Sequence, residues 1–162
     1  MNAEIWSDAS SRAGWYKYRG GPVLGGELGT CFDLCVLQEE GRLRMYFSWR
    51  PKQALALSES QDGIHWSQPV VVLGPRESQA GWEDDLNRPC VLERNGVYHM
   101  WYTGQSRPGD DENGFSWIFY ATSSNGVDWE RASLEPVLSP QEDWENRAVV
   151  LWDEASQEFK MW

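Results

Sequence analysis

Two seven-residue segments of this chain are near-copies of each other. Ser60–Trp66 reads Ser-Gln-Asp-Gly-Ile-His-Trp, and Ser123–Trp129 reads Ser-Ser-Asn-Gly-Val-Asp-Trp. The two segments begin roughly 60 residues apart, a spacing that is typical of proteins built from repeated structural units. A repeat of this length that consists of strands predicts a ring of β-sheet blades. The repeat therefore constrains both the fold and the places where a functional site can lie.

The similarity continues into the flanking sequence and divides it into strands and turns. A Cys-Val-Leu segment begins at Cys35 and again at Cys90, and the related Val-Val-Leu segment begins at Val149. Each segment is followed by a polar turn and then by a Met-aromatic pair, which predicts a β-hairpin. Asn95-Gly96 is the strongest turn signal, because both residues tolerate the positive φ that a tight hairpin requires.

Two further strands complete each full unit. We expect a third strand at 54–58 and at 117–122, each leading into a Ser-x-(Asp/Asn)-Gly-x-x-Trp turn, and a fourth strand at 69–73. In the turn, the Asp or Asn side chain bonds to nearby backbone, the Gly supplies a left-handed conformation and the Trp fills the space between sheets. Four antiparallel strands in about 60 residues match the size of a propeller blade.

The predicted fold is therefore all-β, with β-propeller blades of four antiparallel strands. We place an N-terminal segment, a candidate closing strand, at 1–20 and a partial β-propeller at 21–162, with blade 1 at about 30–73, blade 2 at about 86–135 and an incomplete blade 3 at about 145–162. A β-sandwich with chance similarity is the alternative. Because a propeller closes only with four or more blades, we expect a fragment or one part of an assembled ring, completed by self-association or by a missing second half.

Composition and charge exclude several classes of function. A formal net charge of −11 argues against nucleic acid as a partner, since proteins that bind it need basic surfaces. No apolar run is long enough to span a membrane, and the N-terminus lacks the basic and apolar segments of a secretory signal. A cytoplasmic location is therefore expected. The odd number of cysteines, three, agrees with a reducing compartment.

The cysteines and histidines predict neither a disulfide nor a metal site. Cys31 and Cys35 would lie about 13 Å apart along a strand, which is too far for a disulfide. No pair with the spacing of metal ligands joins the cysteines with His65 or His99. We therefore expect no metal and no cofactor, and we interpret Cys35 and Cys90 as small buried apolar residues.

Four kinds of motif carry a family resemblance. They are the two turns described above, the Met-Trp-Tyr-Thr-Gly run at 100–104, the Tyr-Ala-Thr-Ser run at 120–123 and the Pro-Val-Leu runs at 22–24 and 136–138. Together they resemble the five-bladed β-propeller glycosidases, a superfamily of arabinanases, β-xylosidases, invertases, levansucrases and mannoside phosphorylases. The resemblance covers roughly the first half of such a domain, about two and a half blades. It implies a carbohydrate ligand and an active-site funnel at one end of the central channel.

In that superfamily, acidic residues near the starts of successive innermost strands cleave the glycosidic bond. The resemblance therefore implies that Asp33 is the base or nucleophile, that Asp85 orients the substrate or tunes the acid, and that Glu145 is the proton donor. Paired carboxylates suit this chemistry, because the protonated one assists the leaving oxygen while the ionised one drives attack. Asp84 is a further candidate for substrate binding. Each of these residues has a structural alternative as a turn cap or a solvated loop charge.

The sequence departs from the family pattern at two positions. Alignment on the strand core matches Asp33 with Arg88 and Arg147, where the superfamily would have carboxylates. Two roles are open for the arginines: ion pairs with the acidic residues, or recognition of an anion, because guanidinium binds phosphate in a fork. In the phosphorylases of the superfamily, arginines hold the attacking phosphate. Trp117, at the end of a long Gly- and Asp-containing insertion, and Trp49 are candidates for stacking on a sugar ring.

The sequence as a whole predicts a carbohydrate-active propeller that is similar to glycoside hydrolases. One alternative is a non-catalytic propeller module that binds carbohydrate or protein. Another is a glycoside phosphorylase in which Arg88 and Arg147 hold phosphate. Activity on aryl glycosides separates the enzymes from the binding module, and a need for phosphate separates the two enzymes.

Overall fold

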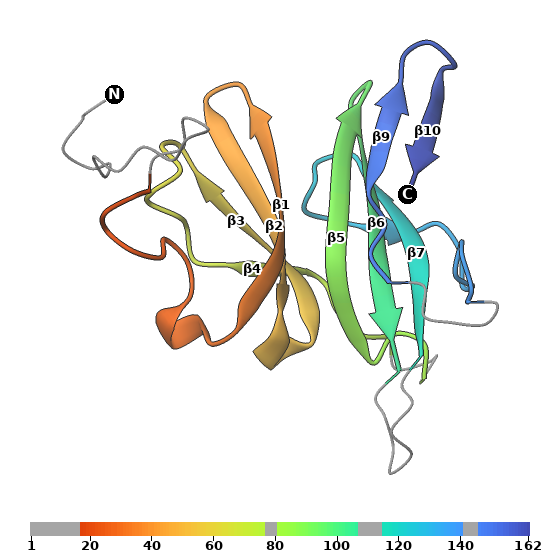
Figure 1. The fold of residues 1–162 in the computed structure, drawn as a ribbon, viewed down its shortest axis with the longest axis horizontal. Helices are drawn as coiled ribbons and strands as arrows, with labels where there is room; N and C mark the ends of the chain where they lie inside the picture. Colours follow the sequence, from red (N-terminus) through yellow and green to blue (C-terminus); the bar gives the residue numbers. More distant parts are fainter. Residues whose placement is uncertain (1–16, 77–80, 107–114, 141–145) are drawn as a thin grey trace.

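The strands of the described residues form two four-stranded antiparallel sheets and a two-stranded hairpin (Figure 1). The computed structural model describes residues 17–76, 81–106, 115–140 and 146–162. The first sheet contains β1 (Cys31–Glu39), β2 (Arg42–Trp49), β3 (Ala54–Ser60) and β4 (Val70–Leu73); the second contains β5 (Asp85–Arg94), β6 (Val97–Gln105), β7 (Ser116–Ser123) and β8 (Glu130–Arg131); and β9 (Val150–Asp153) pairs with β10 (Glu158–Met161). The predicted all-β fold of four-stranded antiparallel units is confirmed.

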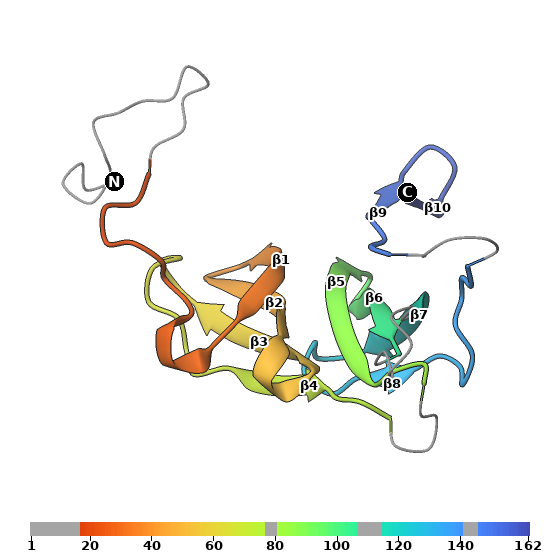
Figure 2. The ribbon, with the colours of Figure 1, turned by 60° about the horizontal axis from the view of Figure 1, so that its bottom comes forward.

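The strands of each sheet follow one another in the order of the sequence, so each sheet is a simple meander. β1 and β5 face each other between the two sheets, whereas β4 and β8 lie at the opposite edges (Figure 2). β5 also contacts β9 of the hairpin. On its other side, β5 contacts β2 and β3 of the first sheet, so the two sheets pack against each other with their first strands side by side, as blades do around a propeller axis. Among the described residues, no helix is long and apolar enough to cross a membrane.

The main core lies between the two four-stranded sheets. Tyr46 and Leu55 from the first sheet and Met100 and Tyr102 from the second have no exposed surface. The second strand of each sheet, β2 or β6, contains five consecutive buried residues, because both faces of the sheet are covered. Each fully buried large apolar side chain contributes about 1.5–3 kcal/mol to the free energy of folding. The stacking of the two sheets is therefore the principal source of stability.

The repeated turns have the chemistry that the sequence predicts. Oδ1 of Asp62 accepts hydrogen bonds from the backbone N–H groups of the second and third residues after it, at 2.9 and 2.8 Å, and Oδ1 of Asn125 does the same at 2.8 and 2.9 Å. Gly63 and Gly126 have φ of 74° and 73°, values that favour glycine. Trp129 packs edge-on against a tyrosine of the first sheet, at 5.9 Å between ring centroids. The predicted turn chemistry is confirmed for both copies, and Trp129 lies between the two sheets, whereas Trp66 packs against a separate cluster of the first sheet.

Two cysteines join neighbouring units through hydrogen bonds. The Sγ of Cys35 accepts the backbone N–H of Val91 at 3.2 Å, and the Sγ of Cys90 accepts that of Val150 at 3.3 Å. Burial raises the pKa of the Cys35 thiol to about 11, so this residue stays protonated near neutral pH. All three cysteines are free thiols. Cys35 and Cys90 therefore act as partly buried polar links between units, in addition to filling space as the sequence predicts.

Candidate functional site

The candidate site is built on a distortion that recurs in the first strand of each unit. The pairing register shifts between Phe32 and Cys35 in β1 and at the equivalent place in β5, so each strand has a β-bulge. Asp33 and Arg88 occupy the bulges with φ of 52° and 54°, and Arg147, just before β9, has φ of 87°. Such a left-handed residue other than glycine costs roughly 1–3 kcal/mol and is frequent at functional sites. The three residues that the sequence aligns with one another therefore share one unusual backbone conformation.

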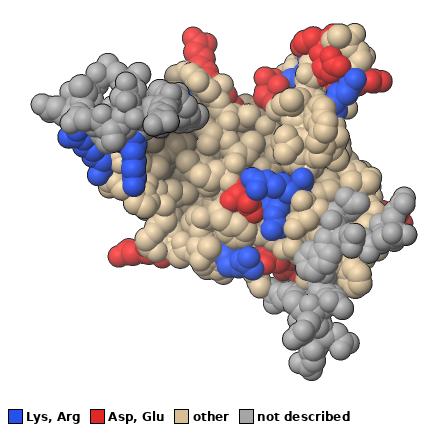
Figure 3. All heavy atoms as spheres, in the orientation of Figure 1, with Lys and Arg blue, Asp and Glu red and all other residues tan. Residues whose placement is uncertain are grey.

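The side chains of these three left-handed residues form a cluster. The carboxylate of Asp33 lies 3.5 Å from Nε of Arg88 and 3.7 Å from Nη1 of Arg147. Basic and acidic side chains lie side by side on the face between the two sheets (Figure 3). The Asp33 and Arg88 side chains are 16% and 24% exposed, whereas that of Arg147 is 59% exposed. The cluster is thus an acid with one partly buried and one accessible guanidinium beside it.

Two atoms of this cluster have unused hydrogen-bonding capacity. Within the described residues, Oδ2 of Asp33 and Nη1 of Arg88 are buried and have no hydrogen-bond partner. Buried polar atoms are usually satisfied, so unsatisfied ones call for an explanation. The cluster thus holds one buried acceptor and one buried donor that the described residues leave unused.

The predicted second-blade acids lie close to one another in sequence but make separate contacts. Asp85, at the start of β5, is buried, and its Oδ2 accepts a hydrogen bond of 3.5 Å from Nη1 of Arg50. The guanidinium of Arg50 also lies 5.0 Å from the ring centroid of Phe32. Oδ1 of Asp84 accepts the backbone N–H of Gly81 at 3.0 Å. Asp85 thus belongs to a second acid–arginine pair, and Asp84 stabilises its own loop.

The predicted aromatic residues contact protein groups near their own strands. Nε1 of Trp49 donates a hydrogen bond of 2.8 Å to the carbonyl of Leu28, which joins β2 to the segment before β1. Trp117 packs against Trp82 at 6.2 Å and against Phe115 at 6.1 Å between ring centroids. Both tryptophans are only partly buried. Their role in binding a sugar stays a prediction, as does the role of Glu145 as proton donor, because Glu145 lies outside the described residues.

Glu83 is a further acidic residue of the loop that contains Asp84, and it is fully buried. Its side chain has no exposed surface, and its carboxylate accepts hydrogen bonds of 2.8 Å from the hydroxyl of Tyr102 and 2.9 Å from Nε of Arg131. Nε of Arg76 lies 3.1 Å from the other oxygen. Burial, followed by the nearby Glu83 charge, raises the pKa of Tyr102, so its hydroxyl remains a donor. Through Arg76 and Arg131, Glu83 links the segment that follows β4 with strand β8. Its position in an acidic loop did not indicate this structural role.

A metal centre is not formed by the part of the chain that the structure describes, where no group of three or more His, Cys, Asp and Glu side chains is placed to hold an ion. The chemistry that the cluster offers is that of a carboxylate and two guanidinium groups. Such a set can accept a hydrogen bond at Asp33 and bind an anion or a polar sugar hydroxyl at the arginines.

Known proteins resemble this chain in sequence or in fold. No family model matches the chain. The "Uncharacterized protein MT1551" of Mycobacterium tuberculosis (strain CDC 1551 / Oshkosh) is 24% identical over 140 residues, which are 78% of this chain and 44% of that protein. The α-L-arabinanase of Cellvibrio cellulosa, solved in complex with arabinohexaose, superposes with a TM-score of 0.61 at 14% identity over 81% of this chain and 43% of its own.

Two further solved structures come from other glycosidase families. The family 32 β-fructofuranosidase of Bombyx mori matches with a TM-score of 0.59 at 16% identity, over 76% of this chain and 28% of its own. A family 117 glycoside hydrolase of Zobellia galactanivorans matches with a TM-score of 0.61 at 12% identity, over 77% of this chain and 46% of its own. The fold is that of part of a five-bladed propeller of the glycosidase type. The chain spans less than half the length of each of these relatives, and the predicted resemblance in fold is confirmed.

Proposed function

We propose that this chain is part of a carbohydrate-active propeller in which Asp33 is the carboxylate that acts at the glycosidic bond. The observation that supports the proposal is the position of Asp33: it lies on a strained bulge of an innermost strand, partly buried, with an unsatisfied oxygen. Strained, unsatisfied polar groups of this kind are frequent at active sites. The fold shared with glycoside hydrolases makes a sugar the ligand class to test first.

In hydrolysis, ionised Asp33 acts in one of two ways. As a base, it removes a proton from water while the water oxygen forms a bond to the anomeric carbon. As a nucleophile, its own oxygen forms that bond first and water later displaces it. In either case the bond from the anomeric carbon to the leaving oxygen breaks, and a second carboxyl group supplies the proton that the leaving oxygen needs. Glu145 is our candidate for this proton donor.

Phosphorolysis is a second candidate function, favoured by the two arginines beside Asp33. Nη1 of Arg88 is buried without a hydrogen-bond partner among the described residues, and Arg147 is accessible. Two guanidinium groups suit a phosphate, which would then replace water as the group that attacks the anomeric carbon. In this reaction the phosphate oxygen forms the bond to the anomeric carbon, the bond to the leaving oxygen breaks with a proton from a second carboxyl group, and the product is a sugar phosphate.

Turnover of a panel of aryl glycosides and oligosaccharides, measured with and without inorganic phosphate, tests both candidates. We expect Asp33→Asn to lower kcat by about 10²- to 10⁴-fold, the usual contribution of a general acid or base. Glu40→Gln, in the exposed turn between β1 and β2, is the matched control and should leave kcat unchanged. Thermal unfolding of both variants verifies that each is folded.

The outcomes separate the candidate functions. Turnover without phosphate supports hydrolysis, whereas turnover that requires phosphate and releases a sugar phosphate supports phosphorolysis. Sugar binding without turnover, detected by calorimetry, would replace the enzyme with a non-catalytic carbohydrate-binding module. If the folded protein neither binds nor converts any glycoside in the panel, the proposal is wrong.

A further inference from the structure

The bulges that carry the Asp33 cluster need partners that hold them. A bulge removes a backbone N–H from the regular ladder of the sheet, and a buried N–H must find another acceptor. The left-handed conformation of Asp33, Arg88 and Arg147 adds to this need, because residues with a Cβ adopt it only where the surroundings enforce it. The groups that accept the backbone N–H bonds of Arg88 and Arg147 therefore help to decide where these two side chains point.

Two buried hydroxyl groups are the acceptors. The backbone N–H of Arg88 donates a hydrogen bond of 2.9 Å to Oγ of Ser48, and the backbone N–H of Arg147 donates one of 3.2 Å to Oγ1 of Thr103. Ser48 and Thr103 have no exposed surface. They occupy equivalent positions in β2 and β6, each paired with the residue that precedes the bulge of its own sheet. A hydroxyl of one unit thus holds the left-handed residue of the next unit, at the bulge of β5 and again just before β9.

Packing alone does not explain a hydroxyl at these two positions. Ser48 follows Phe47, and Thr103 follows Tyr102, in strands whose buried stretches are otherwise mostly apolar. A hydroxyl in such a setting is unfavourable unless it forms a hydrogen bond, and Ala or Val would fill the same space. The hydrogen bond to the following bulge is the interaction that distinguishes a hydroxyl from these apolar residues.

We propose that Ser48 and Thr103 are positioning residues that set the guanidinium groups of Arg88 and Arg147 against Asp33. The inference rests on the proposed function of that cluster. With its N–H held, each arginine projects toward the carboxylate and reaches it at 3.5 or 3.7 Å. Without the acceptor, the bulge no longer has a partner for its N–H, and a shift of one residue would turn the side chain to the opposite face of the strand.

Thr103 allows the sharper test, because two substitutions separate its hydroxyl from its volume. Thr103→Val keeps the branched shape and removes the acceptor, whereas Thr103→Ser keeps the acceptor and removes a methyl group. We expect Thr103→Val to lower kcat/KM for the best glycoside of the panel by roughly tenfold or more, as small misplacements of active-site groups do. Thr103→Ser should restore most of the activity. Ser48→Ala should act in the same direction through Arg88.

A crystal structure of the Thr103→Val protein makes the inference independent of any substrate. We expect the Arg147 guanidinium to lie outside ion-pair distance of Asp33 in this variant and within it in Thr103→Ser. An unmoved Arg147 in a folded Thr103→Val protein would overturn the positioning role, whatever the activity. A displaced Arg147 in the variant, combined with an unmodified protein that neither binds nor converts any glycoside, would support the positioning role and reject the proposed function. Equal loss of activity in the Val and Ser variants would also count against the inference, because it would assign the effect to packing.

Discussion

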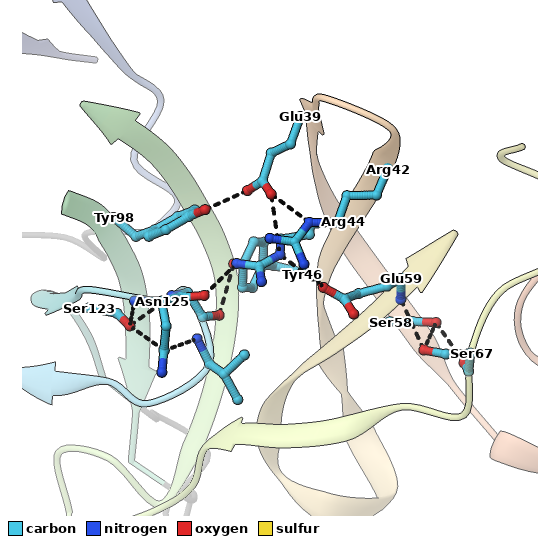
Figure 4. Close-up of polar contacts among 12 residues, drawn as sticks. Glu39, Arg42, Arg44, Tyr46, Ser58, Glu59, Ser67, Tyr98, Ser123 and Asn125 are labelled. Carbon is cyan, nitrogen blue, oxygen red and sulfur yellow. Dashed lines mark hydrogen bonds and ion pairs between the residues drawn. The ribbon is translucent and has the colours of Figure 1, made fainter. Parts of the chain in front are cut away.

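The guanidinium Nη1 of Arg44, in the first sheet, donates a hydrogen bond of 2.6 Å to the backbone carbonyl of Asn125, in the turn of the second sheet (Figure 4). The hydroxyl of Tyr46, two residues along β2, donates one of 2.9 Å to the carbonyl of the next turn residue, Gly126. The repeated turn of the second sheet therefore also contacts the first sheet. Its carbonyl groups accept hydrogen bonds from the preceding unit, and this contact joins β2 of the first sheet to the turn between β7 and β8 of the second.

Replacement of Arg44 should weaken the contact between the two sheets. Its side chain is only 5% exposed, and it also lies 2.9 Å from Glu59 and stacks on the ring of Tyr98 at 5.2 Å. We expect Arg44→Met to lower the free energy of unfolding by about 2 kcal/mol, because the carbonyl of the turn and the carboxylates lose their donor. Urea denaturation measures the change. Arg42→Met, at a side chain that is 42% exposed, should cost less than about 1 kcal/mol and serves as the control.

Gly126 should tolerate no side chain. A Cβ at this position would meet Nη1 of Arg44 and would lie 2.6 Å from the hydroxyl of Tyr46, in a backbone conformation with φ of 73°. We expect Gly126→Ala to cost about 3 kcal/mol or more, since steric displacement adds to backbone strain. Gly41→Ala is the matched control, with φ of 75° and no atom within 4 Å of the added Cβ. It should show only the strain, about 1–2 kcal/mol, and equal costs for the two variants would contradict the contact with Arg44.

Glu83 should be essential for stability and not for binding a ligand. Because its fully buried carboxylate lies between Arg76 and Arg131, its replacement leaves two guanidinium groups without their counter-charge. We expect Glu83→Gln to lower the free energy of unfolding by about 3 kcal/mol, measured by chemical denaturation. The exposed Glu40→Gln variant should change it by less than about 0.5 kcal/mol. A Glu83→Gln protein of unchanged stability would refute the structural assignment.

Stability should depend on pH through His99, which contacts the third unit. Its ring stacks against Tyr120 and lies 4.8 Å from the ring of Phe159 in β10. Burial lowers the pKa of His99 from its ordinary value of about 6.5. Below that pH the unfolded chain binds a proton that the folded protein does not, so the free energy of unfolding falls as the pH drops through this range.

The His99→Phe variant isolates this effect. It should lose less stability than the unmodified protein between about pH 7.5 and pH 5.5, and the difference cannot exceed about 1.4 kcal/mol for each pH unit. Denaturation curves of both proteins at several pH values provide the comparison. Parallel pH profiles would show that His99 does not titrate differently in the folded and unfolded states.

Local sequence patterns predicted a large part of the fold. Asn95-Gly96 closes the β5–β6 hairpin, and both residues have positive φ. The side chains of Asp62 and Asn125 cap their turns as expected. These features depend on neighbours in the sequence, so their chemistry can be recognised without knowledge of the fold. The hydrogen bonds of Cys35 to Val91 could not be recognised in this way, because they join different sheets.

The candidate site was only partly predictable for the same reason. The sequence identified Asp33, Arg88 and Arg147 as equivalent positions of a repeat, and it left open whether the arginines pair with acids or bind an anion. The structure brings all three together and pairs both arginines with Asp33. The roles of Ser48 and Thr103 had no sequence signal, because a Ser or Thr in a strand has the same appearance whether or not its hydroxyl holds a neighbouring bulge.

The repeated Ser-x-(Asp/Asn)-Gly-x-x-Trp turn shows which features follow from the sequence and which depend on the tertiary structure. By itself, the sequence determined the strands, the turns and the repeat length, because backbone conformation and side-chain capping act over a few residues. Only the tertiary structure decided that Arg44 holds the turn of the next unit and that Asp33 meets two arginines. These contacts join residues far apart in the chain, and their geometry depends on how the sheets stack and where their first strands bulge.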